Sequence, residues 1–235
     1  NIIGTFNLIE CCKMFKIKHL LSASTSSVYG ASNNMPFKED ESINTPMSVY
    51  AATKISTEVI GHAYSYNYQL PMTFFRFFTV YGSWGRPDMA LFKFTKNALE
   101  GSPIDVFNYG KMKRDFTYID DLVNAIIRLT SVAPSNDSNQ KKYADDTLSS
   151  VAPWRAVNIG SSRPVDLNYF IDVLEQNLNL EIKKNYIEMQ AGDVPSTFAN
   201  TELLEKLTDF RPEFSVEEGV KRFVSWYKKY NKIGE

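Results

Sequence analysis

Short runs dominated by apolar residues alternate with longer amphipathic stretches along this chain. The short runs at 17–24, 72–78 and 155–160 predict buried β-strands. Elsewhere apolar residues recur every three or four positions, and this period predicts helices at 1–15, 48–68, 91–101, 119–132, 167–178 and 216–230. The order of strand, helix and strand predicts a parallel α/β sheet.

Other stretches complete the predicted arrangement. Residues 104–109 predict a further strand, and residues 109–116 predict a turn. Residues 134–153 are polar and poor in large apolar side chains, which predicts a loop or a disordered insert. We expect Ser48 to cap the start of the helix at 48–68, and we expect Gly101 to end the helix at 91–101.

Polar or small residues follow the predicted strands. They lie at 24–27, 78–82 and 158–162. In a parallel sheet, ligands bind at the carboxyl ends of the strands. We therefore expect these three segments to converge on one site.

Composition limits the classes of function. The chain has 235 residues, 43% of them hydrophobic, and a net charge of -1, so nothing indicates nucleic acid or an anionic membrane as partner. No apolar run approaches the ~20 residues that cross a bilayer. The adjacent Cys11 and Cys12 are poorly placed to bridge each other, which favours a reducing, cytoplasmic location. With only two histidines and no Cys/His pattern, no metal site is predicted.

Tyr50 and Lys54 lie four residues apart on a predicted helix. This spacing puts both side chains on one face, one turn apart. An ammonium group beside a phenol favours the phenolate, and such a pair can act as a general acid and base near neutral pH. The same spacing occurs by chance in many helices, so the pair gains meaning only from the hydroxyl group of Thr25 at a strand end before it.

The combination of "STSSVYG" at 24–30 with "YAATK" at 50–54 resembles the extended short-chain dehydrogenase/reductases, the NAD-dependent epimerase/dehydratase family. The resemblance implies a Rossmann-type doubly wound parallel sheet with a smaller α/β substrate-binding domain. It implies NAD as cofactor and a catalytic triad of Thr25, Tyr50 and Lys54. Tyr50 and Lys54 would also contact the cofactor, together with Phe77 and Val80.

Four further segments carry the resemblance over essentially the whole chain. They are "FRFFTVYGSWGRPDMALFKFTKNALEG", "GKMKRDFTYIDDLVNAI", "VNIGSSRPVDL" and "AGDVPSTFAN". A guanidinium makes paired hydrogen bonds to phosphate oxygens, so Arg114 is the expected diphosphate ligand. The resemblance implies a set of substrate-binding residues: Ser26, Ser27, Thr79, Arg86, Phe107, Arg114 and Asp193.

Ser26 and Ser27 indicate the kind of reaction. Dehydratases of the family carry Asp-Glu directly after the catalytic threonine, and decarboxylases usually carry a glutamate here. Small hydroxyls instead leave room and donors for a sugar carboxylate, which a neighbouring carboxylate would repel. The resemblance thus implies NAD-dependent epimerisation of a UDP-sugar at C4 through a 4-keto intermediate, with UDP-glucuronate as the favoured substrate.

Other functions stay open at this point. Ser26 and Ser27 would also tolerate a neutral CH2OH group, as in a UDP-glucose/UDP-galactose 4-epimerase, and a UDP-glucuronate decarboxylase is a related alternative. A non-catalytic sugar-nucleotide-binding remnant is an alternative from another class. The chain starts without methionine, directly in a helix, and has no glycine-rich phosphate loop. We expect it to be the C-terminal part of a longer protein, to bind NAD poorly alone, and to be inactive in that form.

The resemblance also implies a domain division and an assembly. Residues 1–79 and 117–160 would form the remainder of the NAD-binding domain, with 134–153 as an insert. Residues 80–116 and 161–235 would bind the sugar nucleotide. We expect a homodimer through the helices at 1–15 and 48–67.

Overall fold

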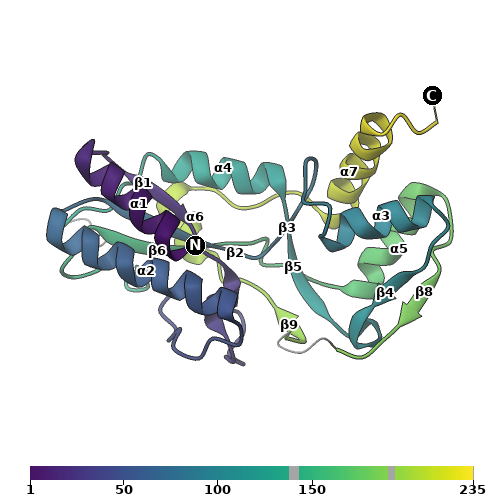
Figure 1. Ribbon diagram of the computed structural model, residues 1–235, viewed down its shortest axis with the longest axis horizontal. Helices are drawn as coiled ribbons and strands as arrows, with labels where there is room; N and C mark the ends of the chain where they lie inside the picture. The colour runs from purple at the N-terminus through teal and green to yellow at the C-terminus, as the bar shows by residue number, and fades with distance from the viewer. Residues whose placement is uncertain (138–142, 190–193, 235) are drawn as a thin grey trace.

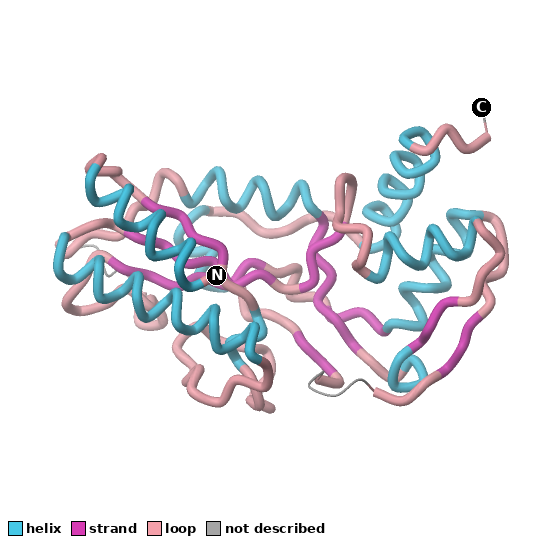
Figure 2. Tube along the Cα trace, in the orientation of Figure 1, coloured by secondary structure: helices cyan, strands magenta, loops and turns pink. Residues whose placement is uncertain are grey.

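The computed structural model describes residues 1–137, 143–189 and 194–234. Figure 1 shows two neighbouring regions, one around strands β1, β2 and β6 and the other around α3, α5 and α7. The chain passes between the two regions several times. Figure 2 shows strands near the middle of the molecule, where the two regions meet. The residues of the predicted site lie close to this junction.

The first region is built on a parallel three-stranded sheet. Its strands are β1 (Leu20–Ala23), β2 (Met72–Phe77) and β6 (Trp154–Ile159), in the order β1-β2-β6. Leu20 pairs with Met72, which pairs in turn with Trp154, so all three strands begin at the same edge. The predicted parallel sheet is confirmed.

Helices cover both faces of this sheet (Figure 1). They are α1 (Ile2–Met14) and α2 (Val49–Tyr68) on one face, and α4 (Ile119–Leu129) and α6 (Glu202–Thr208) on the other. Phe74 packs in a cluster with Ile9 of α1, whereas its neighbour Phe75 packs with Leu122 of α4 and Leu203 of α6. Successive side chains of a strand point to opposite faces, so a strand buried on both faces is apolar throughout. The doubly wound arrangement is confirmed.

The second region combines short strands with three helices. Strands β3 (Thr79–Tyr81), β5 (Lys113–Tyr118), β7 (Pro164–Asp166) and β9 (Ser196–Thr197) form one sheet, and β4 (Ile104–Val106) pairs with β8 (Lys184–Tyr186). The helices are α3 (Ala90–Leu99), α5 (Leu167–Leu178) and α7 (Val216–Tyr230). An aromatic core joins them, in which Phe116 and Phe170 stack with ring centroids 4.1 Å apart.

Two sequence predictions for 104–116 were only partly right. The predicted strand at 104–109 ends at Val106, where a 3-10 helix, η2 (Phe107–Gly110), begins. The predicted turn at 109–116 gives way to β5 at Lys113. The start of β5 is polar because it lies beside the site, where the side chain of Arg114 lines a cavity rather than the core.

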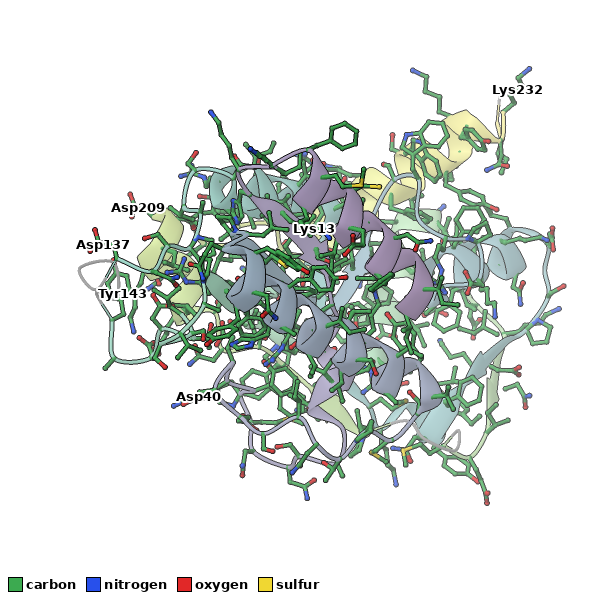
Figure 3. All side chains as sticks on the ribbon, turned by 60° about the vertical axis from the view of Figure 1, so that its left-hand side comes forward. Lys13, Asp40, Asp137, Tyr143, Asp209 and Lys232 are labelled. Carbon is green, nitrogen blue, oxygen red and sulfur yellow. The ribbon has the colours of Figure 1, made fainter. Side chains whose placement is uncertain are left out.

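The prediction of a loop or disordered insert at 134–153 was only partly right. Residues 138–142 lie outside the described residues, but the chain after them is held in place. Tyr143, labelled in Figure 3, donates a hydrogen bond to the Lys206 carbonyl in α6. Asp146 forms a buried ion pair with Arg155 at 2.8 Å, and Leu148 is buried. The polar residues of this segment are therefore used in contacts that hold it in place, among them the ion pairs Asp146–Arg155 and Asp145–Lys206.

The predicted helix ends were confirmed. The Ser48 hydroxyl accepts a hydrogen bond from the Ala51 amide at 3.1 Å, which caps α2. Gly101 follows the end of α3 with φ +70°, a conformation that favours glycine. The cap on α2 fixes where Tyr50 and Lys54 emerge.

Candidate functional site

Thr25 lies directly beyond the carboxyl end of β1. It is 9% exposed, and its side chain caps the 3-10 helix η1 (Ser26–Tyr29) by accepting a hydrogen bond from the Ser27 amide at 3.2 Å. The Thr25 hydroxyl also contacts the Ser27 hydroxyl at 3.2 Å. This turn gathers three hydroxyl groups at the edge of the sheet.

Helix α2 brings the predicted acid/base pair to the same edge. The Lys54 ammonium donates a hydrogen bond to the Ala23 carbonyl at 3.0 Å, at the last residue of β1. Burial lowers the pKa of Lys54, and the negative charge of Glu58 partly opposes that shift. Tyr50 stays 48% exposed and lines a cavity with Thr25. The arrangement can hold a hydroxyl group between a phenol and a threonine.

Two cavities meet at Thr25, Phe78 and Met89. The larger, of about 630 Å³, is also lined by Tyr50 and by apolar residues that include Phe77 and Val80. It therefore contains four of the residues predicted to act in catalysis or to bind NAD. Lys54 reaches this end of the sheet through its bond to Ala23 instead.

The smaller cavity, of about 240 Å³, contains the predicted sugar-nucleotide residues. Besides Thr25 it is lined by Ser26, Ser27, Thr79 and Arg114. These residues come from η1, β3 and β5, which are far apart in sequence. Among its described lining residues there is one cation and no carboxylate. The cavity can accept an anionic ligand through hydroxyl donors and a guanidinium.

Three other predicted substrate residues are not among the described residues that line the smaller cavity. Phe107 begins η2 and lines neither of these two cavities. Arg86 lines the larger cavity and makes a paired contact with Asp88, with distances of 2.6 and 3.0 Å. Asp193 lies outside the described residues. Substrate binding by Arg86, Phe107 and Asp193 stays a prediction.

Of the three strand ends expected to converge, only two do. The third, at 158–162, lines neither of the two cavities. Asn158 is fully buried, and its side chain binds the Tyr29 hydroxyl at 2.6 Å and the Phe37 carbonyl at 2.9 Å. The amides of Ser161 and Ser162 donate to Asp115. This strand end is structural because its polar groups are used inside the protein.

A buried polar network lies beside the predicted catalytic residues. Arg76 of β2 binds both carboxylate oxygens of Glu58, at 2.9 and 3.1 Å, and Glu58 also accepts a hydrogen bond from Ser24 at 2.5 Å. Glu58 follows Lys54 by one turn of α2, and Ser24 precedes Thr25. The network thus ties the helix that carries Tyr50 to the strand end that carries Thr25.

Sequence reasoning missed part of the smaller cavity's wall. Met47, Val194 and Thr197 line it. Met47 precedes α2, and the other two belong to the segment "AGDVPSTFAN", which was singled out for Asp193 alone. The pairing of β9 with β5, which sets Thr197 opposite Arg114, is a tertiary contact without a local sequence signal.

In the described ranges, no helix is long and apolar enough to cross a membrane. No cluster of three or more His, Cys, Asp or Glu side chains that could hold a metal ion occurs among residues 1–137, 143–189 and 194–234.

A parallel sheet with helices on both faces, and cavities at the carboxyl ends of its strands, defines a Rossmann-type protein. Residues 1–142 match the model of the NAD dependent epimerase/dehydratase family, and the chain belongs to that family.

The chain is also similar to individual proteins of known name. The chain is 52% identical over 228 residues to a probable UDP-glucuronate 4-epimerase of Rhizobium meliloti, covering 97% of this chain and 67% of that protein. It is 43% identical over 236 residues to UDP-glucuronate 4-epimerase 1 of Arabidopsis thaliana, covering 98% of this chain and 54% of that protein. The solved UDP-glucuronic acid 4-epimerase of Bacillus cereus, in complex with UDP-glucuronic acid and NAD, has a TM-score of 0.83 and 30% identity. That match covers 97% of this chain and 67% of the solved chain.

Proposed function

We propose that this chain carries the catalytic residues of an NAD-dependent UDP-sugar 4-epimerase whose substrate is UDP-glucuronate. The observation that carries the choice of sugar is the 240 Å³ cavity, with its hydroxyl groups, one guanidinium and no carboxylate among the described lining residues. A sugar carboxylate would accept hydrogen bonds from Ser26, Ser27 and Thr79. The named relatives at 52% and 43% identity support the same substrate.

The residues of the larger cavity fit the reactive half of NAD. Tyr50 offers a polar group for a ribose, and Phe77 and Val80 offer an apolar wall for a flat ring. Lys54, bonded to the Ala23 carbonyl at the end of β1, offers a second polar group. When bound, NAD supplies the hydride acceptor and donor that protein side chains lack. We propose that residues 1–79 and 117–160 hold most of the cofactor, and that 80–116 and 161–235 hold most of the sugar nucleotide. Val80, at the boundary, lines the larger cavity, and α6 of the last range packs on the first sheet.

The side chains divide the work on the substrate. Tyr50 takes the proton of the sugar 4-hydroxyl while Lys54 stabilises the phenolate charge. Thr25 donates a hydrogen bond to the same oxygen. Arg114 holds the diphosphate, so that the 4-keto sugar rotates and presents its opposite face without leaving the cavity. Tyr50 then returns the proton, and the configuration at C4 is inverted.

We propose a homodimer formed through α1 and α2. The two helices lie side by side (Figure 1) and expose large apolar side chains, among them Ile3, Val59 and Tyr66. Light scattering should give twice the mass of one chain, and Val59→Glu should give the monomer; a monomeric unaltered protein would refute the assembly.

The free thiols of Cys11 and Cys12 support a reducing, cytoplasmic location.

The substrate is tested by placing a charge in the smaller cavity. Ser27 is exposed and lines this cavity, so Ser27→Asp adds a carboxylate beside the proposed position of the sugar carboxylate. We expect kcat/KM for UDP-glucuronate to fall at least about tenfold more than kcat/KM for UDP-glucose. Ser27→Asn has the same size without the charge and should spare this preference. Equal losses on both substrates would refute UDP-glucuronate and favour a UDP-glucose 4-epimerase.

A further inference from the structure

Asp115 is a buried carboxylate that takes no part in the proposed chemistry. It lies on β5 with no exposed surface, next to Arg114. Burying a carboxylate costs free energy unless hydrogen bonds replace its hydration. The bonds that Asp115 makes therefore show what it holds in place.

Three backbone amides and one hydroxyl donate to this carboxylate. The amide of Ser161 lies 2.6 Å from one oxygen, and the Thr117 hydroxyl lies 3.3 Å from the same oxygen. The amides of Ser162 and Ala199 each lie 3.0 Å from the other oxygen. Amides bound to a charged acceptor form stronger bonds than neutral pairs do.

The three amides come from two segments that meet at Asp115. Ser161 and Ser162 follow β6 of the first sheet. Ala199 follows β9, whose Thr197 pairs with Arg114 and lines the cavity, as does Val194. Asp115 thus connects the end of the first sheet, strand β5 and the cavity wall.

The packing around the carboxylate leaves little room for adjustment. A Cβ added at Gly160 would come within 2.8 Å of an Asp115 oxygen and 2.7 Å of the Ala199 Cβ. Both distances are shorter than ordinary contacts, so Gly160 permits the close approach of the two segments. The cluster therefore restricts movement of Ala199 relative to Gly160 and Asp115, in addition to the pairing of β9 with β5.

We propose that Asp115 is a positioning residue for the nucleotide end of the substrate. Its carboxylate holds the segment 194–199 against β5, so that Thr197 and Arg114 face the diphosphate together. Arg114 and Asp115 are successive residues of a strand and point to opposite sides, one toward the ligand and one toward the support. The inference rests on the proposed function, because it takes the smaller cavity to be the sugar-nucleotide site.

The proposal predicts a selective effect on binding. None of the hydrogen bonds of Asp115 described above involves Thr25, Tyr50 or Lys54. Loss of the carboxylate should therefore raise the KM for the UDP-sugar and the Kd for UDP, while kcat changes little. A purely structural role would instead lower the amount of folded protein and leave the KM of the remainder unchanged.

The test compares two buried aspartates that bind backbone amides. Asp121 is 2% exposed and accepts hydrogen bonds from the Glu213 and Phe214 amides at 3.0–3.1 Å, and it lines neither cavity. In Asp115→Asn we expect the Kd for UDP, measured by calorimetry, to rise about 10- to 100-fold with kcat within about threefold. In Asp121→Asn the Kd should stay unchanged while the melting temperature falls. Gly160→Ala, which crowds the same carboxylate, should reproduce the weaker UDP binding.

Three outcomes would overturn the proposal. These are an unchanged Kd in Asp115→Asn, an equal rise in Asp121→Asn, or a fall in kcat at constant KM. If Asp115→Asn does not fold, an unchanged Kd in Gly160→Ala overturns it. An unaltered protein that binds UDP but does not convert UDP-glucuronate would refute the proposed function and leave this comparison intact.

Discussion

The Arg76–Glu58 pair should be the most costly ion pair to break near the active site. Their side chains are 3% and 2% exposed and lie 2.9 Å apart. Glu58→Gln removes the negative charge but leaves Arg76 buried, with only the Tyr29 hydroxyl and the Glu39 carbonyl as its other described acceptors. Breaking a buried pair in this way costs about 3–5 kcal/mol. For a chain of this length that corresponds to a fall in melting temperature of about 6–20 °C.

The exposed pair Arg86–Asp88 provides the matched control. It is as short, at 2.6 Å, but its side chains are 73% and 60% exposed. Such surface pairs contribute about 0–1 kcal/mol because water and salt screen them. Urea unfolding of Glu58→Gln and Asp88→Asn measures both costs on the same protein. If Glu58→Gln loses no more free energy of unfolding than Asp88→Asn does, the stabilising role assigned to burial is wrong.

Three further predictions concern chemistry, binding and pH. Tyr50→Phe should lower kcat by about 10²–10⁴-fold with unchanged Kd for UDP, whereas Tyr66→Phe, at an exposed position of the same helix, should have no effect; near-normal turnover in Tyr50→Phe would exclude it as the base. Arg114→Lys should raise the KM for the UDP-sugar about 10-fold, because an ammonium lacks the paired donors of a guanidinium; an unchanged KM would remove Arg114 from the diphosphate site. Burial raises the pKa of Glu39 from 4.5 to about 7, so the native state binds the extra proton between those pH values. The free energy of unfolding should therefore fall by about 3 kcal/mol from pH 4.5 to pH 8, and Glu39→Gln should remove most of that fall in urea titrations; an unchanged pH dependence in the variant would refute it.

The hydrophobic periodicity and capping residues of the sequence predicted most of the secondary structure. The apolar strands, the amphipathic helices and the Ser48 cap follow from periodicity and capping chemistry. The start of β5 was mistaken for a turn because its first three residues are charged: Arg114 lines the smaller cavity, and Asp115 is buried with hydrogen-bond partners. Residues 143–153 were expected to be a loop or a disordered insert, but the ion pairs Asp146–Arg155 and Asp145–Lys206 hold them in place. Such pairings depend on the complete fold and leave no local pattern.

The sequence likewise predicted some residues of the candidate site and missed others. Thr25, Ser26, Ser27, Thr79 and Arg114 line one cavity as expected. The first four follow the carboxyl ends of the parallel strands β1 and β2, whereas Arg114 comes from the start of β5 in the second sheet. The end of β6 was expected there too, but its polar groups are used by the buried partners Tyr29 and Asp115. The supporting roles of Glu58 and Asp115 could not be seen in the sequence, since their partners are distant backbone and side-chain groups.

The central claim is that this site inverts C4 of UDP-glucuronate. The most direct measurement is proton NMR of the purified protein, in a form that calorimetry shows to bind NAD+, with UDP-glucuronate and NAD+. The signal followed is the anomeric proton of the sugar. The proposal predicts a growing UDP-galacturonate signal that stops at an equilibrium between the two sugars and is absent in Tyr50→Phe. Release of carbon dioxide with a pentose signal, or conversion of UDP-glucose but not UDP-glucuronate, would contradict it.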